Sequence, residues 1–430
     1  MGTAAVQTVL APKRMDDAPP VRVPEGLSVV IVSDFGSING GASRIAIQNA
    51  IGLAERGVPV RFAYAVAPLS SELEHPLIEV IHIRAEEVWQ TRNRLSAAAN
   101  GVWNRRASDE FRQVIAGLDP ARTVVHIHQW TKAFSPSVIA AARDAGFRVV
   151  VTLHDYFMVC PNGIYYDFAT HQPCARKPMS ASCVARNCDR LGGLYKAVRV
   201  ARQFGVKRAI AGAGRTVHLV HVSAFSHDTT ASIMPGELPQ HVVPNPIDVA
   251  QGIRTPAERN EPFVFVGRFV AEKGIMAFAR AVLATGVRAI AIGDGPLREE
   301  FRRLCPQAET TGWVDGETVN RVMRSARALV FPSRWNETGS LVGIEASANG
   351  LPVIASEKTA AGAFIRASGG GITVPMGDDA ALAAAINRLR DPVEAERLSR
   401  RAYDDYWAKP LDRDHYMERI AAVYAEALNP

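Results

Sequence analysis

Short runs of β-branched and other apolar residues alternate with longer segments of helical periodicity along most of this chain. The runs are apolar at successive positions, which is typical of strands buried on both faces in a parallel sheet. This alternation predicts α/β domains with helices on both sides of each sheet. The expected strands cover residues 27–33, 58–66, 78–83, 123–128, 148–154 and 217–223, and then 263–267, 288–292, 328–332, 352–356 and 372–375.

The pattern breaks at residues 241–248, where Pro244 and Pro246 flank Asn245, and a polar stretch follows. We interpret this break as a linker between domains, because 430 residues exceed one ordinary core. The expected organisation is a disordered tail over 1–24, an N-terminal domain over 25–247 with a cysteine-rich insertion at 156–190, a C-terminal domain over 248–408, and a C-terminal helix over 409–430 that packs back on the N-terminal domain.

The composition narrows the class of protein. Apolar residues make up 47% and charged residues 21% of the chain, which is typical of globular proteins and excludes a disordered, collagen-like or coiled-coil chain. Five cysteines are too few for a disulfide-built secreted scaffold. A net charge of +6 suits an anionic small substrate or membrane surface, but is too small to indicate a nucleic-acid binder. With no apolar run of about 20 residues and no signal-peptide pattern, we expect a cytoplasmic protein.

Two glutamates flank the start of an expected helix in residues 331–356. Glu337 lies in the loop after a strand, and Glu345 follows eight residues later, about one and a half turns into the helix. Both carboxylates can then face one cleft and accept hydrogen bonds from sugar hydroxyls. The backbone N–H groups at the helix start can hold a phosphate; they belong to Thr338, Gly339, Ser340 and Leu341. The plainer alternative is a pair of glutamates on a solvated helix.

Two cations follow another strand. Arg268 comes directly after the strand at 263–267, and Lys273 lies five residues further on. A guanidinium fork and an ammonium point charge together suit a diphosphate. The alternative is two ordinary surface cations.

Glycines and histidines mark further strand ends. Gly40 and Gly41 precede the first expected helix, where backbone can approach a ligand, although a Gly-Gly pair is more often only a turn. His128 and His154 end two neighbouring expected strands, and His126 shares a face with His128. Ligands bind at the carboxyl ends of parallel strands, so these histidines are candidates, with a structural role as the alternative.

The arrangement Glu337-x7-Glu345, followed by Ala346 and a Gly-Leu-Pro-Val strand, resembles family 4 glycosyltransferases. The resemblance extends from about residue 27 to residue 389. It implies an α/β protein of the GT-B fold, with two Rossmann-like doubly wound domains facing a cleft. It also implies a retaining, nucleotide-sugar-dependent transferase of the exopolysaccharide or capsule type that needs no catalytic metal. The implied partners are a UDP- or GDP-sugar and a glycan or lipid-linked acceptor.

The resemblance also implies roles for individual residues. Arg268 and Lys273 would grip the donor diphosphate, Glu337 would orient the donor sugar, and His128 would touch that sugar. We expect His154 on the acceptor side. The remaining donor-binding positions implied are Glu345 for the ribose, Gly40 and Gly41 beside the phosphate, Gly339, Ser340 and Leu341 at the helix start, Gly293 near the nucleotide, and Val314 near the base.

Two positions depart from the family pattern. Gly339 and Ser340 stand where the family often has an aromatic-Gly pair, and residues 359–365 replace an expected acidic Gly-Gly element. These departures leave the identity of the donor sugar open.

Four cysteines fall close together, and they leave three alternatives open. Four thiolates would satisfy a structural zinc ion, but the spacing lacks a close Cys-x2-Cys pair. The other two alternatives are free thiols and redox-active pairs of cysteines. The four residues are Cys160, Cys174, Cys183 and Cys188.

Residues 191–215 combine basic and apolar positions at helical spacing. The pattern predicts a helix that could bind an anionic lipid surface, at the inner face of the plasma membrane, or a diphosphate-bearing lipid. An ordinary domain helix with a solvated basic face is the alternative.

Two other functions fit the same fold. A nucleotide-sugar epimerase would need additional acid–base residues around the sugar, and the sequence shows no distinctive ones. A non-catalytic glycan- or lipid-binding protein would be favoured by loss of Arg268, Lys273 or Glu345, yet all three are present.

Overall fold

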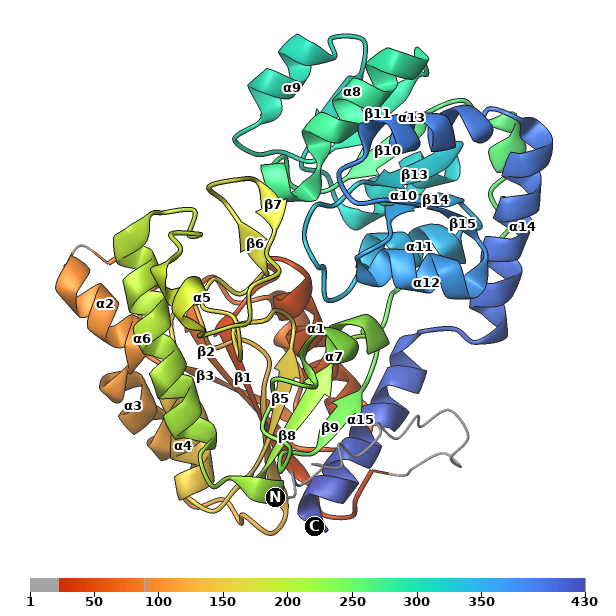
Figure 1. Ribbon diagram of the computed structural model, residues 1–430. Coiled ribbons are helices and arrows are strands. Elements are labelled where there is room, and N and C mark those ends of the chain that lie inside the picture. Colours follow the sequence, from red (N-terminus) through yellow and green to blue (C-terminus); the bar gives the residue numbers. More distant parts are fainter. Residues whose placement is uncertain (1–22, 89, 92, 430) are drawn as a thin grey trace, which may run out of the picture. The chain divides into compact units, whose positions relative to one another are not determined.

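The computed structural model describes residues 23–88, 90–91 and 93–429 (Figure 1). The expected tail over 1–24 lies outside the described residues as far as residue 22. The described chain forms two compact units. Unit 1 holds residues 23–163, 176–245 and 413–429, and unit 2 holds residues 164–175 and 246–412. The division at 245/246 lies two residues before the expected boundary, and residues 164–175, expected in the N-terminal domain, group with unit 2.

Unit 1 is built on a seven-stranded parallel sheet in the order β3-β2-β1-β4-β5-β8-β9. Its central strands are buried along almost their whole length, so both faces of the sheet are covered. Six of the strands match the expected apolar runs to within a few residues. The bounds are β1 Ser28–Phe35, β2 Val60–Val66, β3 Ile78–His82, β4 Thr123–Ile127, β5 Arg148–Leu153, β8 Val217–His221 and β9 Gln240–Val242.

Helices connect the strands of unit 1. The C-terminal helix α15 packs on α1, where Met417 of α15 lies against Gly52 of α1. It also contacts β4, β5 and β8. Helices α3, α4 and α6 form a contiguous layer, and α2 packs on α6. The bounds are α1 Gly41–Ala54, α2 Arg94–Val102, α3 Arg105–Ile115, α4 Ser137–Asp144, α5 Ala181–Ala185, α6 Gly193–Ile210, α7 Ala224–Thr230 and α15 Arg413–Leu428.

Unit 2 holds a six-stranded parallel sheet in the order β12-β11-β10-β13-β14-β15. It also holds the antiparallel hairpin of β6 (Tyr166–Asp167) and β7 (Gln172–Pro173). The sheet strands are β10 Phe263–Val266, β11 Ala289–Ile292, β12 Glu309–Gly312, β13 Ala328–Phe331, β14 Val353–Ser356 and β15 Gly371–Val374.

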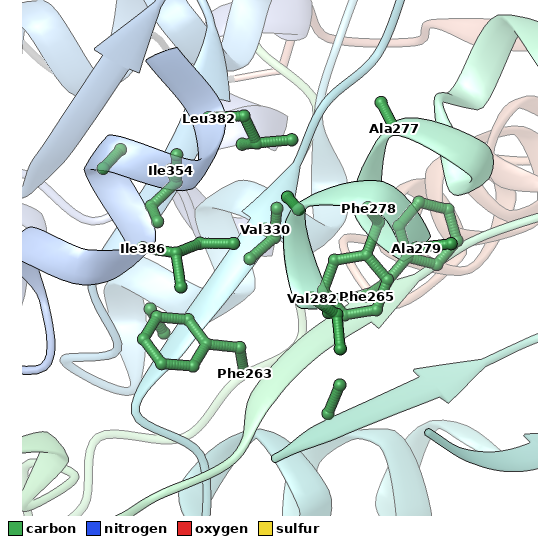
Figure 2. Packing of buried hydrophobic residues seen from close by; sticks show 14 of the residues in the cluster. Phe263, Phe265, Ala277, Phe278, Ala279, Val282, Val330, Ile354, Leu382 and Ile386 are labelled. Carbon is green, nitrogen blue, oxygen red and sulfur yellow. The ribbon is translucent and has the colours of Figure 1, made fainter. Parts of the chain in front are cut away.

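Successive side chains of these strands point to opposite faces, so the unit 2 sheet separates two cores. On one face, Phe263 and Phe265 pack with helices α8, α9 and α13 (Figure 2). On the other face, Val264 and Leu329 pack with α10, α11 and α12. The bounds are α8 Ile275–Thr285, α9 Arg298–Leu304, α10 Gly316–Arg324, α11 Leu341–Ala348, α12 Ala360–Ser368, α13 Asp379–Arg388 and α14 Pro392–Ala408.

Each sheet has a point where the strand order reverses. In unit 1 the chain runs from β1 outward to β3 and then returns to β4 beside β1. In unit 2 it runs from β10 outward to β12 and returns to β13 beside β10. The loops leaving such a pair of strands diverge to opposite sides, which opens a crevice at the carboxyl ends of the strands. Ligands of open α/β sheets bind at such points of reversal.

Among the residues that the structure describes, we find no helix that is both long and apolar enough to cross a bilayer.

The aromatic cluster of unit 2 yields a test of stability. Phe278 is fully buried, with its ring 5.8 Å from that of Phe265 and 6.4 Å from that of Phe301. We expect Phe278→Ala to lower the free energy of unfolding by about 3–5 kcal/mol, because it leaves a cavity in a close-packed core. Leu283→Ala on the same helix, where the side chain is 44% exposed, should lower the free energy of unfolding far less. Urea titration of both variants checks this, and equal losses would contradict the packing described.

Candidate functional site

The crevice of unit 2 brings Lys273 and Glu337 together. Lys273 follows β10 and Glu337 follows β13, and the Nζ atom of Lys273 donates to Oε1 of Glu337 at 2.8 Å. The Glu337 side chain is only 4% exposed, whereas that of Lys273 is 28% exposed. The hydroxyl of Ser333 donates to the same carboxylate oxygen. Glu337 is therefore a buried anion with two donors, and its cation still reaches solvent.

The backbone around this ion pair is closely packed. Gly274, next to Lys273, has φ of 76°, and a Cβ atom there would lie 2.0 Å from the carbonyl oxygen of Pro332. The N–H of Arg334 donates to the carbonyl of Glu272 at 2.8 Å. The Nζ atom of Lys273 also lies 5.6 Å from the centre of the Trp335 ring, within reach of a cation–π interaction. These contacts fix the loops after β10 and β13 against each other.

Helix α11 begins directly beside Glu337. Ser340 is its N-cap, and the Ser340 hydroxyl accepts from the N–H of Gly343 at 3.2 Å. Leu341 is the first helical residue, so its N–H points out of the helix start. Glu345 lies one turn further along and is half-buried. Gly339 and Ser340 connect Glu337 to the helix, so the structure places these predicted positions around one helix N-terminus, where an anion is stabilised.

Arg268 is the second predicted cation of unit 2. It follows β10 and its side chain is exposed. The neighbouring predicted position, Gly293, follows β11 with φ of 132°, and a Cβ atom there would lie 2.0 Å from the carbonyl oxygen of Gly267. Val314 follows β12 and is half-buried. Thus Arg268, Gly293 and Val314 all stand after the carboxyl ends of neighbouring strands of unit 2.

The crevice of unit 1 contains the predicted histidines. His128 follows β4 and His154 follows β5, and Nδ1 of His128 lies 3.1 Å from Nε2 of His154. Burial lowers the pKa of His154 to about 3 and holds that of His128 well below its usual value. Both rings are therefore neutral at pH 7. They line a pocket at the ends of β4 and β5, together with Trp130, Lys132 and Asp155.

His126 has a structural role. It is fully buried, its Nδ1 lies 2.6 Å from the Tyr424 hydroxyl, and its Nε2 lies 2.7 Å from the Thr152 hydroxyl. The side-chain amide of Asn49 reaches Nδ1 of His126 at 2.9 Å and Nε2 of His128 at 3.2 Å. These hydrogen bonds connect helix α15 to β4, and the contact with Asn49 positions the ring of His128.

Charged residues beside the pocket were missed by the sequence argument. Asp34, at the end of β1, is fully buried and accepts from the N–H groups of Lys132, Ala133 and Phe134 at 2.8–3.0 Å. Burial raises the pKa of Asp155 to about 6. The buried guanidinium of Arg202 lies 4.4 Å from the centre of the Phe157 ring. In the sequence, Asp34 is marked only as an aspartate directly after the first expected strand.

The glycine pair stands where it was expected. Gly40 has φ of 121° and caps helix α1, which starts at Gly41, and both residues are exposed. The N–H of Asn39 donates to the hydroxyl of Ser43 at 2.8 Å, which tightens the turn. The loop therefore presents backbone at the carboxyl end of β1, in the same unit as His128.

The four clustered cysteines are divided between the two units. Cys160, Cys183 and Cys188 are buried in unit 1, whereas Cys174 belongs to unit 2. The buried ammonium of Lys196 lies 3.2 Å from the sulfur of Cys188 and 3.8 Å from that of Cys183. All five cysteines of the chain are free thiols. A structural zinc at this cluster stays a prediction.

Comparison with known proteins bears directly on unit 2. Residues 261–391 match the family model described as "Glycosyl transferases group 1". The matched stretch lies within unit 2, and the likeness to this family is confined to it. It includes Arg268, Lys273, Glu337 and Glu345.

The curated relatives that match this chain include glycosyltransferases. A curated relative is the lipopolysaccharide core biosynthesis glycosyltransferase LpsD of Rhizobium meliloti, 34% identical over 166 residues, which cover 36% of this chain and 47% of LpsD. The chain spans about half the length, or less, of the curated relatives it matches.

The whole described fold has counterparts among solved structures. A sucrose-phosphate synthase from Thermosynechococcus elongatus superposes with a TM-score of 0.68 at 20% identity, covering 94% of this chain and 99% of that one. Anabaena HepE, solved in complex with UDP-glucose, gives a TM-score of 0.62 at 16% identity, with coverages of 93% and 100%. The fold is the GT-B type, with two Rossmann-like α/β domains, as the sequence resemblance implied.

The buried histidine network makes unit 1 sensitive to acid. Burial lowers the pKa of His126 to about 3, against about 6.5 in an unfolded chain. The unfolded state therefore binds an additional proton between these values, so stability is complete above pH 6.5 and falls as the pH drops below it. We expect wild-type stability to decline more steeply than that of His126→Gln between pH 6 and pH 4, by up to about 1.4 kcal/mol per pH unit.

Urea unfolding at several pH values measures this difference. His415→Gln, an exposed position on α15, is the matched control and should keep the wild-type slope. A slope unchanged in His126→Gln would show that this histidine is not held neutral by burial.

Proposed function

We propose that this protein is a retaining glycosyltransferase that moves a sugar from a nucleotide-sugar donor to a hydroxyl group of an acceptor. The observation that carries the proposal is the Lys273–Glu337 pair beside the N-terminus of α11, at the strand-order reversal of unit 2. This constellation lies within the segment that matches group 1 glycosyltransferases. A cation and backbone N–H donors at this place suit a phosphorylated ligand, which supports the proposal.

In this proposal the donor is held by unit 2. Lys273 and Arg268 interact with the diphosphate, and the helix start at Ser340 and Leu341 supplies N–H groups. Glu345 accepts from the ribose hydroxyls, and Glu337 orients the donor sugar while holding Lys273 in place. Gly293 and Val314 lie near the nucleotide. The UDP-glucose complex of HepE supports a uridine nucleotide as the first donor to test, with a guanosine nucleotide as the alternative.

The difficult step of the reaction is departure of the diphosphate. Negative charge develops on the leaving oxygen as the bond to the sugar anomeric carbon breaks. Fixed cations and backbone donors aimed at that charge supply the main stabilisation, because they need no reorganisation during the step. Retention of configuration requires the acceptor to approach the face from which the diphosphate leaves, so the leaving phosphate oxygen can accept the acceptor proton.

The pocket of unit 1 is proposed to take part through its neutral histidines. A neutral ring at His128 can accept from or donate to a sugar hydroxyl without introducing charge, and His154 lies within reach of it. We assign His128 to the donor sugar and His154 to the acceptor side, with Gly40 and Gly41 beside the donor phosphate. A glycan or lipid-linked saccharide of surface polysaccharide synthesis is the proposed acceptor, supported by the likeness to LpsD.

The donor site provides the first experiment. We expect UDP-glucose or another UDP-sugar to raise the melting temperature of the protein, and Lys273→Met to weaken nucleotide binding by about tenfold or more, since a charge-assisted contact is lost. Arg400→Ala, in an exposed ion pair with Glu396 on α14, should bind as the wild type does. Calorimetric titration with UDP, GDP and ADP compares the three nucleotides.

A second variant guards against misfolding. Lys273→Met alone leaves the buried carboxylate of Glu337 with one donor fewer, so Lys273→Met/Glu337→Gln removes the charge pair while keeping its shape. Nucleotide affinity unchanged in both variants would refute the donor site. Binding without sugar transfer to any acceptor would favour the non-catalytic alternative, and conversion of the donor sugar without acceptor would favour the epimerase.

A membrane-facing surface on helix α6 is a further part of the proposal. Helix α6 lies within the basic segment at 191–215, but Lys196 and Arg202 point into unit 1 and are buried. Its outer face instead exposes Leu194 by 71% and Phe204 by 61%, followed by the exposed Lys207 and Arg208. Apolar side chains beside cations suit the interface of an anionic bilayer.

Vesicle sedimentation tests this surface. We expect the protein to bind vesicles that contain anionic phosphatidylglycerol, and Leu194→Ser/Phe204→Ser to lose most of that binding, because about 0.8 kcal/mol is lost per CH₂ no longer buried. The control is Leu283→Ser, at a 44% exposed leucine on α8 of unit 2. Equal binding by both variants would contradict the assignment of α6.

A further inference from the structure

Two histidines and a glutamate meet in unit 1 away from the crevice. His218 lies on β8, His241 on the edge strand β9, and Glu426 near the end of α15. One ligand atom from each lies within 4.8 Å of the others. Among the described residues, it is the one group of three or more histidine, cysteine or acidic side chains whose ligand atoms lie this close together.

The sheet register explains why the two histidines face each other. Val220 of β8 pairs with His241 of β9. Residues two apart on a strand share a face, so His218 projects from the same side of the sheet as His241. Helix α15 packs against β8, and it delivers Glu426 to this place. Three segments that are separate in sequence therefore contribute one potential ligand each.

The tautomer of His218 suits a metal ligand. Its Nε2 lies 3.0 Å from the carbonyl oxygen of Arg215, an acceptor, so Nε2–H donates and Nδ1 carries the lone pair. That Nδ1 lies 3.0 Å from Nε2 of His241. A ligating histidine generally donates its other N–H to a carbonyl or carboxylate, which fixes the ring. The backbone at Arg215 already supplies this second contact.

One of the three side chains connects the site to solvent. Both histidines are buried, and the Glu426 side chain is 34% exposed, which leaves a route for an ion from solvent.

The distances are close to those of a zinc site. Two nitrogens bound to tetrahedral zinc at about 2.0–2.1 Å lie about 3.3 Å apart. The pair in the structure needs to separate by only about 0.3 Å. Without the ion, Nε2–H of His241 donates to Nδ1 of His218, so zinc binding requires the other tautomer of His241, with the proton on its Nδ1 and the Nε2 lone pair free for the ion. Glu426 must give up its ion pair with Arg215, where the atoms are 3.4 Å apart and the side chains are half-exposed, so that the cost is small.

We propose that His218 Nδ1, His241 Nε2 and a carboxylate oxygen of Glu426 bind one zinc ion that fastens the C-terminal helix α15 to the edge of the unit 1 sheet. Two imidazoles and a carboxylate form a donor set for zinc and not for calcium or magnesium, which prefer oxygen ligands. His218 stands near the amino end of β8, whereas the sugar-transfer pocket lies at the carboxyl ends of the strands. The ion therefore has a structural role.

The test uses the full chain without a histidine tag, stripped of metal by a chelator and dialysed. We expect it to take up one equivalent of Zn²⁺, measured by mass spectrometry of the metal, and to melt at a temperature that rises with Zn²⁺ concentration. Mg²⁺ at the same concentration should not raise it. His218→Ala and Glu426→Gln should each bind Zn²⁺ at least about tenfold more weakly.

Matched controls separate this site from other sources of zinc. Glu418→Gln changes an exposed glutamate on the same helix and should bind as the wild type does. Cys183→Ser/Cys188→Ser should also keep the ion, because those sulfurs belong to a different cluster. Glu426→Gln preserves the size of the side chain, so it remains informative if His218→Ala does not fold. Zinc binding unchanged in Glu426→Gln, or absent from the wild type, would overturn the proposal.

Discussion

Parallel strand pairing is the constraint on which the rest of this protein depends. Parallel neighbours require a crossover between every two strands, so the carboxyl ends of all strands in a sheet lie at one edge. The loops leaving that edge then collect side chains that are far apart in sequence. In unit 2 this brings Lys273 after β10 next to Glu337 after β13, and in unit 1 it brings His128 after β4 next to His154 after β5.

The fold class and most of the strands could be predicted from the sequence, because buried parallel strands leave a recognisable hydrophobic pattern. Strands buried on both faces are mostly apolar without alternation, so the runs at 123–128 and 328–332 could be recognised without any partner strand. Two strands of the parallel sheets were not predicted, and both lie at sheet edges: β9, which overlaps the start of the expected linker, and β12. The short hairpin strands β6 and β7 were not predicted either. The β12 sequence Glu-Thr-Thr-Gly is polar and partly exposed, so no hydrophobic pattern marks it.

Parts of the candidate site could not be predicted because they depend on contacts distant in sequence. Asp34 becomes notable only when the turn at residues 132–134 directs three N–H groups at its carboxylate. His126 and His128 look alike in sequence, yet Tyr424 engages the first one from almost 300 residues away, whereas the second lines the pocket. In α6, the basic residues divide between the interior and the surface, and helical periodicity alone does not show which face the domain covers.

The Lys273–Glu337 pair is better understood as a positioning device than as a source of stability. A partly exposed ion pair stabilises a fold by little, and the buried carboxylate of Glu337 loses solvation that the pair must offset. Yet Glu337 is held from a second side by Ser333, and Gly274 permits a backbone approach that other residues would block. The result is an ammonium group held against Glu337, three residues before the N-cap of α11, with 28% of its side chain still exposed. In the proposed donor site this orientation in advance lowers the conformational entropy lost when a phosphate binds, and it places the charge where the proposal needs it.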